Sequence, residues 1–212
     1  MLGNWRPITL LCVDYKIFTK IIVNRIKPLL VKFISPEQFC SVPGRNILNC
    51  NIILRDLLNY VTENNDQMAL ISLDFKQAFD RVNIEFVFKT MLAVGFSFEF
   101  INCIKSLYTN ITSKLKINNE LGYRFSIKRG VRQGCPLSMI LFIIYQETLY
   151  RLIKMNSLLR PIILPNSFKI KLLGYADDSN VFIKSLDDLP ILYNILKIFG
   201  SATGAEINTN KT

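Results

Sequence analysis

The chain has 212 residues, half of them apolar, so it can bury the core of one large domain or of two small, tightly joined ones. Its 26 Lys and Arg residues outnumber its 16 Asp and Glu residues, and the resulting net charge of +10 favours a polyanionic partner such as a nucleic acid. Histidine is absent, which excludes the catalytic triads, zinc sites and general bases that depend on imidazole.

The cysteine pattern and the apolar segments indicate an intracellular protein. The five cysteines are scattered, without Cys-x-x-Cys spacing, as is typical of reduced thiols. The longest strongly apolar stretch, residues 139–145, is too short to span a bilayer, and the N-terminus lacks the features of a signal peptide. We expect no membrane association, and neither the nucleus nor the cytoplasm is favoured.

Helical periodicity predicts the first two elements. A helix is expected over residues 14–34, kinked or divided at Pro28, and a second amphipathic helix over 46–64. The outer face of the first helix is expected to carry the basic residues Lys16, Lys20, Arg25, Lys27 and Lys32. Its inner face is expected to carry Ile17, Ile21, Ile22 and Leu29.

Strands and helices alternate in the next part of the chain. Residues 69–74 are apolar at nearly every position, which predicts a strand buried on both faces. Asn83 and Ser97 are expected to cap helices over 84–94 and 97–108.

Short strands are predicted over 114–118 and 123–127, followed by a long helix that begins at Pro136 and reaches about Met155. A hairpin, a helix over 188–202 and a final strand complete the chain.

Two separate elements deliver carboxylates to strand ends. Asp177 and Asp178 stand in the turn of the hairpin predicted for residues 174–182, and Asp74 ends the apolar run before it. Carboxylates that meet from different strands suit hard divalent cations such as Mg²⁺. A pair of ions about 3.5–4 Å apart can hold the attacking and leaving oxygens of a phosphoryl transfer in line. A second Asp-Asp pair, at 187–188, has the features of an ordinary helix N-terminus.

Five blocks of the sequence together resemble the motifs of one polymerase family. They follow in the family's order and cover nearly the whole chain: residues 4–11, 73–82, 129–138, 175–178 and 204–212. The chain resembles the reverse transcriptase domain of non-LTR retrotransposons of the long interspersed element type. The resemblance implies an α+β, right-hand polymerase fold, with a small antiparallel palm sheet backed by helices.

The same resemblance predicts the domain organisation. Residues 1–65 are expected to form part of the fingers, and 66–212 the palm with interleaved fingers segments. The primer grip and thumb of the family would follow Thr212, so we expect a truncated or decayed reading frame that extends primers poorly on its own.

The resemblance also implies the site residues and their partners. Asp74 and Asp177 would bridge two Mg²⁺ ions, with Mn²⁺ as an alternative, and Asp178 would lie beside them as a third, less direct metal ligand. The reaction would join deoxynucleoside triphosphates to a DNA primer on an RNA template. Phe75 and Phe79 would face the incoming nucleotide, with Phe79 excluding the 2′-hydroxyl.

The remaining candidates are polar or basic. Gln133 and Gly134 would position the nucleotide, Gly134 by letting the backbone approach the base pair. Further candidates are Arg6 and Arg45 for the triphosphate or template, Arg129 and Arg132 for template phosphates, and Lys211 as a general acid.

Several positions depart from the family pattern. They are Cys40 in place of Gly, Ser41 in place of an aromatic residue, Asn49 in place of Asp, Thr148 in place of Pro, and Ser179 in place of an apolar residue. One alternative is therefore a catalytically silent remnant that at most binds nucleic acid. Another is a nucleotide cyclase, which shares the palm architecture, although the block at 129–138 argues against it.

Overall fold

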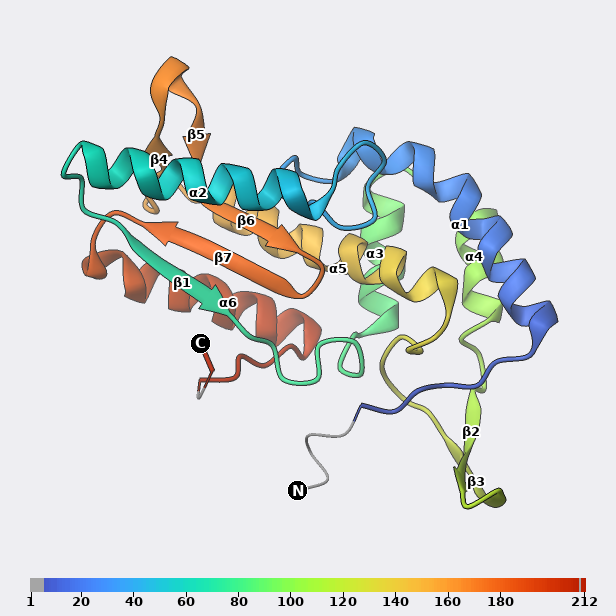
Figure 1. The fold of residues 1–212 in the computed structure, drawn as a ribbon. Helices are drawn as coiled ribbons and strands as arrows, with labels where there is room; N and C mark the ends of the chain where they lie inside the picture. The colour runs from blue at the N-terminus through green and yellow to red at the C-terminus, as the bar shows by residue number, and fades with distance from the viewer. Residues whose placement is uncertain (1–5, 210) are drawn as a thin grey trace.

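The computed structural model describes residues 6–209 and 211–212 as a mixed helix and strand fold (Figure 1). The helices are α1 (Val13–Phe33), α2 (Ile47–Glu63), α3 (Ile84–Ala93), α4 (Phe98–Ser106), α5 (Pro136–Met155) and α6 (Leu189–Thr203), with 3₁₀ turns at Pro165–Ser167 and Leu186–Asp188. The strands are β1 (Ala69–Leu73), β2 (Thr112–Ile117), β3 (Glu120–Ser126), β4 (Ile162–Ile163), β5 (Lys169–Ile170), β6 (Leu172–Tyr175) and β7 (Asp178–Ile183).

Local sequence signals account for most of these boundaries. The side chains of Asn46, Asn83 and Ser97 accept hydrogen bonds from the first turns of α2, α3 and α4. Pro136 occupies the first turn of α5, where the missing N–H costs no helical hydrogen bond. Gly204 ends α6 in the left-handed conformation, at φ 77°.

The central element is an antiparallel sheet with strand order β1-β7-β6, and helices pack against both of its faces. Along β7, Val181 and Ile183 face the main core, while Phe182 faces a second core on the other side. Buried residues of α5 and α6 belong to the main core, and Cys50 and Leu57 of α2 belong to the second. Helix α2 therefore covers one face and α5 and α6 the other, as Figure 1 shows.

Helix α5 is the centre of the molecule. It is buried along nearly its whole length, and α1, α3 and α6 pack against it. The β2–β3 hairpin projects away from this body (Figure 1). Within the described residues, no helix combines the length and apolar character needed to cross a bilayer.

The structure confirms the basic outer face predicted for α1 and the burial of Ile22, but it corrects the rest of the predicted inner face. The buried residues are Thr19, Ile22, Val23, Ile26 and Leu30, whereas Ile17 is 55% exposed and Ile21 and Leu29 are also exposed. Apolar residues surround much of this helix, so periodicity alone could not select the arc that meets α5. The helix also continues through Pro28 without a division.

Two strand predictions need correction as well. Strand β1 is not buried on both faces, because it lies at the edge of the sheet and leaves Leu70 and Ser72 exposed. The final segment forms no strand in the described residues. It makes a single bridge between Ile207 and Phe75, and the chain then turns back on itself at Asn208.

Candidate active site

The sheet register brings the two acidic elements together. Leu73, the last residue of β1, is paired with Ser179 of β7. Asp74 therefore follows β1 beside the turn that joins β6 to β7, and this turn carries Asp177. Asp74 and Asp177 line the same cavity, whose volume is about 850 Å³.

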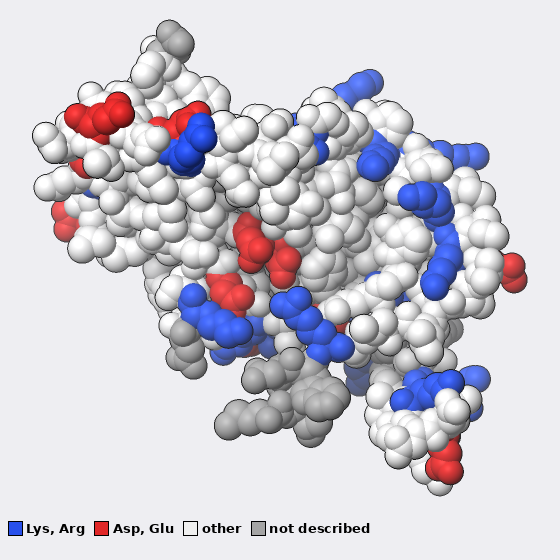
Figure 2. Space-filling model, in the orientation of Figure 1, with Lys and Arg blue, Asp and Glu red and all other residues white. Residues whose placement is uncertain are grey.

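The cavity gathers all but three of the side chains predicted for the site. Those that line it are Arg6, Asp74, Phe75, Phe79, Arg132, Gln133, Gly134, Asp177 and Lys211. They come from five separated stretches of sequence, so the tertiary fold assembles them. Figure 2 shows acidic surface near the β6–β7 turn with basic side chains close by.

Asp178 is one of the three residues outside the cavity lining. Its side chain is exposed, and its pKa is raised by partial burial and by repulsion from Asp177 and Asp74, which Arg6 only partly offsets. Among the described residues, no group of three or more Asp, Glu, Cys or His side chains is close enough to hold an ion. The structure thus brings two of the three predicted carboxylates into one cavity.

Asp74 is held by residues near the end of the chain that we did not predict. The side-chain amide of Asn208 donates to Asp74 Oδ2 at 2.7 Å, and its backbone N–H donates to the Asp74 carbonyl at 2.8 Å. The Asp74 N–H donates to Thr212 Oγ1 at 3.2 Å. Asn208 lies in the last motif block, but nothing in its local spacing marks it as a partner of Asp74.

The two predicted aromatic residues are shared between the core and the cavity. The half-buried ring of Phe79 stacks on Phe142 of α5, with centroids 4.4 Å apart and 16° between the planes. Phe75 makes an edge-to-face contact with Phe199 of α6, at 6.3 Å. Because both residues also line the cavity, packing on the helices fixes how they face it.

Gly134 permits a close backbone approach, but to Thr9. Its φ is 101°, and a Cβ at this position would lie 2.9 Å from the Thr9 carbonyl oxygen. The Thr9 N–H donates to the Gln133 carbonyl at 2.9 Å. This contact ties the segment after Arg6 to the loop before α5, which brings Arg6 to the cavity.

The basic candidates separate into two groups. Arg6, Arg132 and Lys211 line the cavity, and the Arg132 guanidinium lies over the Tyr15 ring at 5.0 Å. Arg129 lies outside it, with its guanidinium beside Gly204 after α6.

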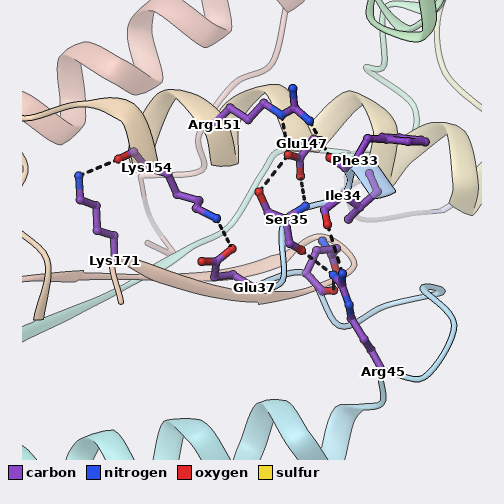
Figure 3. A network of polar contacts seen from close by, with 10 residues as sticks. Phe33, Ile34, Ser35, Glu37, Arg45, Glu147, Arg151, Lys154 and Lys171 are labelled. Carbon is purple, nitrogen blue, oxygen red and sulfur yellow. Dashed lines mark hydrogen bonds and ion pairs between the residues drawn. The ribbon is translucent and has the colours of Figure 1, made fainter. Parts of the chain in front are cut away.

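Arg45 also lies outside the cavity lining, which corrects its predicted place. Its guanidinium donates to the carbonyl oxygens of Ile34, Ser35 and Gln38 at 2.5–3.2 Å (Figure 3). Partial burial lowers the pKa of this group, while Glu37 and Glu147 raise it. The guanidinium therefore shapes the loop after α1 rather than facing the cavity.

Comparison with known proteins agrees with the family resemblance of the sequence motifs. Residues 2–212 match the family model described as "Reverse transcriptase (RNA-dependent DNA polymerase)". The chain is 34% identical over its whole length to the "Transposon TX1 uncharacterized 149 kDa protein" of Xenopus laevis, of which it covers 16%. It is 24% identical to the Pol polyprotein of the type-1 retrotransposable element R2 of Popillia japonica, covering 99% of this chain and 29% of that protein.

Solved structures share the fold. A telomerase from Candida tropicalis, in complex with a fragment of telomeric RNA, superposes with a TM-score of 0.63 at 16% identity. The match covers 91% of this chain and 32% of the telomerase. A Candida albicans telomerase gives a TM-score of 0.62 at 12% identity, over 93% of this chain and 33% of that chain.

The match to the family model extends over almost all of the chain, and its relatives are proteins of non-LTR retrotransposons. With the mixed fold that the telomerases share, these findings establish that the chain belongs to the reverse transcriptase (RNA-dependent DNA polymerase) family.

Proposed function

We propose that this chain carries out RNA-templated DNA synthesis, adding deoxynucleoside triphosphates to the 3′-hydroxyl of a DNA primer. The observation that carries the proposal is the convergence of Asp74 and Asp177 in one cavity with Gln133, Gly134 and Phe79. The chain spans 16–29% of the length of the first two curated relatives, so it corresponds to one part of those longer proteins.

The carboxylates of Asp74 and Asp177 would hold the two Mg²⁺ ions of such a site, with Mn²⁺ as a substitute. Mg²⁺ is usually bound through one or two carboxylates, with waters and substrate phosphates completing its shell, so two protein carboxylates are an adequate set. Burial is the main reason for the raised pKa of Asp178, and repulsion from Asp177 and Asp74 adds to it, which is local negative charge that a bound cation would relieve. Bound ions would supply charge neutralisation and in-line alignment of the reacting oxygens.

The other cavity residues would bind and orient the substrates. Phe79, fixed against Phe142, would lie under the sugar and disfavour a 2′-hydroxyl. Arg6 and Arg132 would attract the triphosphate and template phosphates, and Lys211 would place a protonated amine near the leaving pyrophosphate. Catalysis would then rest on positioning and charge, which a chain without histidine can supply.

The test is addition of a single nucleotide to a DNA primer annealed to RNA, with enzyme in excess and Mg²⁺ present. We expect incorporation that falls at least about a hundredfold in Asp74→Asn and in Asp177→Asn, because each loses a carboxylate that stabilises the transition state. Asp187→Asn is the matched control, since this exposed aspartate belongs to the other Asp-Asp pair, before α6, and lies outside the cavity lining.

A parallel measurement separates the proposal from a silent remnant. Mn²⁺ binding to the same variants, followed by electron paramagnetic resonance, reports on the carboxylates without requiring turnover. Binding and incorporation that both depend on Asp74 and Asp177 support the polymerase. Absence of both in a folded chain that still binds primed RNA would show a nucleic-acid-binding remnant instead.

A further inference from the structure

The segment after α1 extends the sheet that carries Asp177. Gln38 forms a parallel bridge with Gly174 of β6. The Phe39 N–H donates to the Gly174 carbonyl, and the Gly174 N–H donates to the Glu37 carbonyl, both at 2.9 Å. This segment therefore lies along the free edge of β6, beside the turn at the end of that strand.

The side chain of Gln38 reaches into this turn. It is 1% exposed, and its Oε1 accepts hydrogen bonds from the N–H groups of Ala176 at 3.1 Å and Cys40 at 2.9 Å. Its Nε2 donates to Gln146 Oε1 at 3.1 Å and, at 3.4 Å, to the Ala176 carbonyl. The side-chain amide thus contacts both the N–H and the C=O of the residue before Asp177.

Ala176 has a left-handed backbone conformation, which the hydrogen bonds with Gln38 stabilise. Its φ is 55°, in the left-handed region that residues with a Cβ seldom adopt. The conformation aims the following residue, Asp177, and the Gln38 amide bonds the backbone on both sides of the Ala176 Cα.

A buried polar network supports Gln38 from behind. Gln146 Nε2 donates to Ser179 Oγ, and the hydroxyl groups of Ser179 and Tyr150 lie within hydrogen-bond distance, each at 2.9 Å. All three residues are at most 2% exposed. A Cβ on Gly174 would lie 1.7 Å from the Tyr150 hydroxyl, so only a glycine at this position of β6 leaves space for that hydroxyl group. Buried networks with satisfied members favour one arrangement of the groups they join.

The loop that carries Gln38 is itself fastened at several points (Figure 3). Glu147 of α5 accepts hydrogen bonds from the Ser35 N–H and hydroxyl at 2.8 and 2.9 Å. Lys154 pairs with Glu37 at 2.8 Å, and Arg45 holds the carbonyl oxygens of residues 34, 35 and 38. The position of Gln38 is therefore fixed from α5 and from Arg45, which lies just before α2.

We propose that Gln38 is a positioning residue of the active site, which holds the Ala176 turn so that Asp177 faces Asp74. Its effect on ion binding rests on the function proposed above, whereas its hold on the turn does not. The residue comes from the segment predicted to be fingers and acts on the hairpin predicted to be palm.

Two substitutions test the proposal in the full chain. Gln38→Met keeps a similar volume but removes both hydrogen-bonding groups, and Gln38→Asn keeps an amide that is one methylene too short to reach Ala176. In each folded variant we expect the Ala176 amide to exchange its hydrogen at least about tenfold faster, because its acceptor is lost. Mn²⁺ should bind about tenfold more weakly, as is usual when support for a ligand is removed.

Two controls exclude a general loss of stability. Gln67→Ala removes an exposed glutamine amide outside the network. Ile104→Val trims a buried side chain in α4, which packs on α3, and lowers the stability of the core without touching the hairpin. Both should leave Ala176 exchange and Mn²⁺ affinity within about twofold of the parent chain.

The outcomes are distinguishable. Unchanged Ala176 exchange and unchanged Mn²⁺ affinity in either folded Gln38 variant would overturn the positioning role alone. Mn²⁺ binding by the parent chain that ignores Asp177→Asn would instead overturn the proposed metal site, and with it the role of Gln38 in presenting Asp177.

Discussion

Phe79 shows how one side chain can serve both the core and the site. Its stacking on Phe142 satisfies the apolar demands of a core residue, and its place in the cavity lining leaves part of the ring available to a substrate. Packing in the core is therefore compatible with the nucleotide-facing role that the family resemblance predicts for Phe79.

Phe79→Val should relax discrimination against ribonucleotides, because the smaller side chain leaves space for a 2′-hydroxyl. We expect the ratio of deoxynucleotide to ribonucleotide incorporation to fall about tenfold or more, within the range that a single steric contact supplies. Single-nucleotide addition with matched deoxy- and ribonucleoside triphosphates measures this ratio. Phe75→Val is the comparison, since Phe75 also lines the cavity. If the ratio of deoxynucleotide to ribonucleotide incorporation does not change in Phe79→Val, Phe79 has a packing role only.

Asp80 carries a pH-dependent contribution to stability. Partial burial raises the pKa of its carboxyl group above the usual value, although Gln133 and Arg6 oppose the shift. The folded chain therefore holds this proton more tightly than the unfolded chain does. The favourable contribution is complete below the unfolded pKa, about 4, and is lost as the pH rises through the folded pKa.

Asp80→Asn, which cannot ionise, should accordingly gain stability relative to the parent chain as the pH rises from about 4 to 7. Urea unfolding at several pH values measures the difference. Asp56→Asn, at an exposed position in α2, reports the general effect of removing one negative charge. If the difference in unfolding free energy between Asp80→Asn and the parent chain does not grow with rising pH, the raised pKa of Asp80 does not contribute to stability in this way.

At the scale of elements, α5 is the structural centre on which the loop after α1 depends. Glu147 is 3% exposed in the middle of this helix, and besides Ser35 it accepts a hydrogen bond from Arg151 at 2.8 Å (Figure 3). Arg151 in turn donates to the Phe33 carbonyl at 2.7 Å. One buried carboxylate therefore ties the end of α1 to the middle of α5.

Glu147→Ala should destabilise the chain by about 3 kcal/mol, because it leaves the buried N–H and hydroxyl of Ser35 without partners. The free energy of unfolding in urea measures the loss. Glu85→Ala is the matched control, since the exposed pair of Glu85 with Lys105 should contribute less than about 1 kcal/mol. Equal losses in the two variants would show that Glu147 does not fasten the loop.

At the scale of the whole molecule, charge distribution and cavity complement each other. The net charge is +10, while the carboxylates of Asp74 and Asp177 face the cavity. Basic side chains also follow the visible face of α1, as Figure 2 shows. The positive surface attracts polyanions without regard to sequence, while Asp74 and Asp177 provide a local acidic site within the cavity.

Binding of primed RNA should weaken steeply with salt, because phosphate contacts release counterions. If about five phosphates are neutralised, the affinity should fall roughly 500-fold between 50 and 200 mM salt. Fluorescence anisotropy with a labelled duplex measures the slope. An affinity for primed RNA that does not change over this salt range would show that the basic residues do not contact its phosphates.

Local chemistry determined much of the fold from the sequence alone. Caps such as Asn83 and Ser97 act within one helical turn, and Pro136 and Gly204 impose their own dihedral angles, so these boundaries needed no knowledge of distant residues. The same holds for the acidic hairpin turn. The motif blocks identified the family, and the match to its model confirmed it.

The tertiary structure alone decided which faces and which partners these elements use. The arc of α1 that is buried, the edge position of β1 and the side-chain partner of Asp74 all depend on residues far away in the chain. Ser41 likewise adopts a left-handed conformation, at φ 56°, whereas the neighbouring Cys40, which stands where the family has Gly, does not. Sequence spacing encodes contacts within a helix or hairpin, but a hydrogen bond across more than a hundred residues leaves no local pattern.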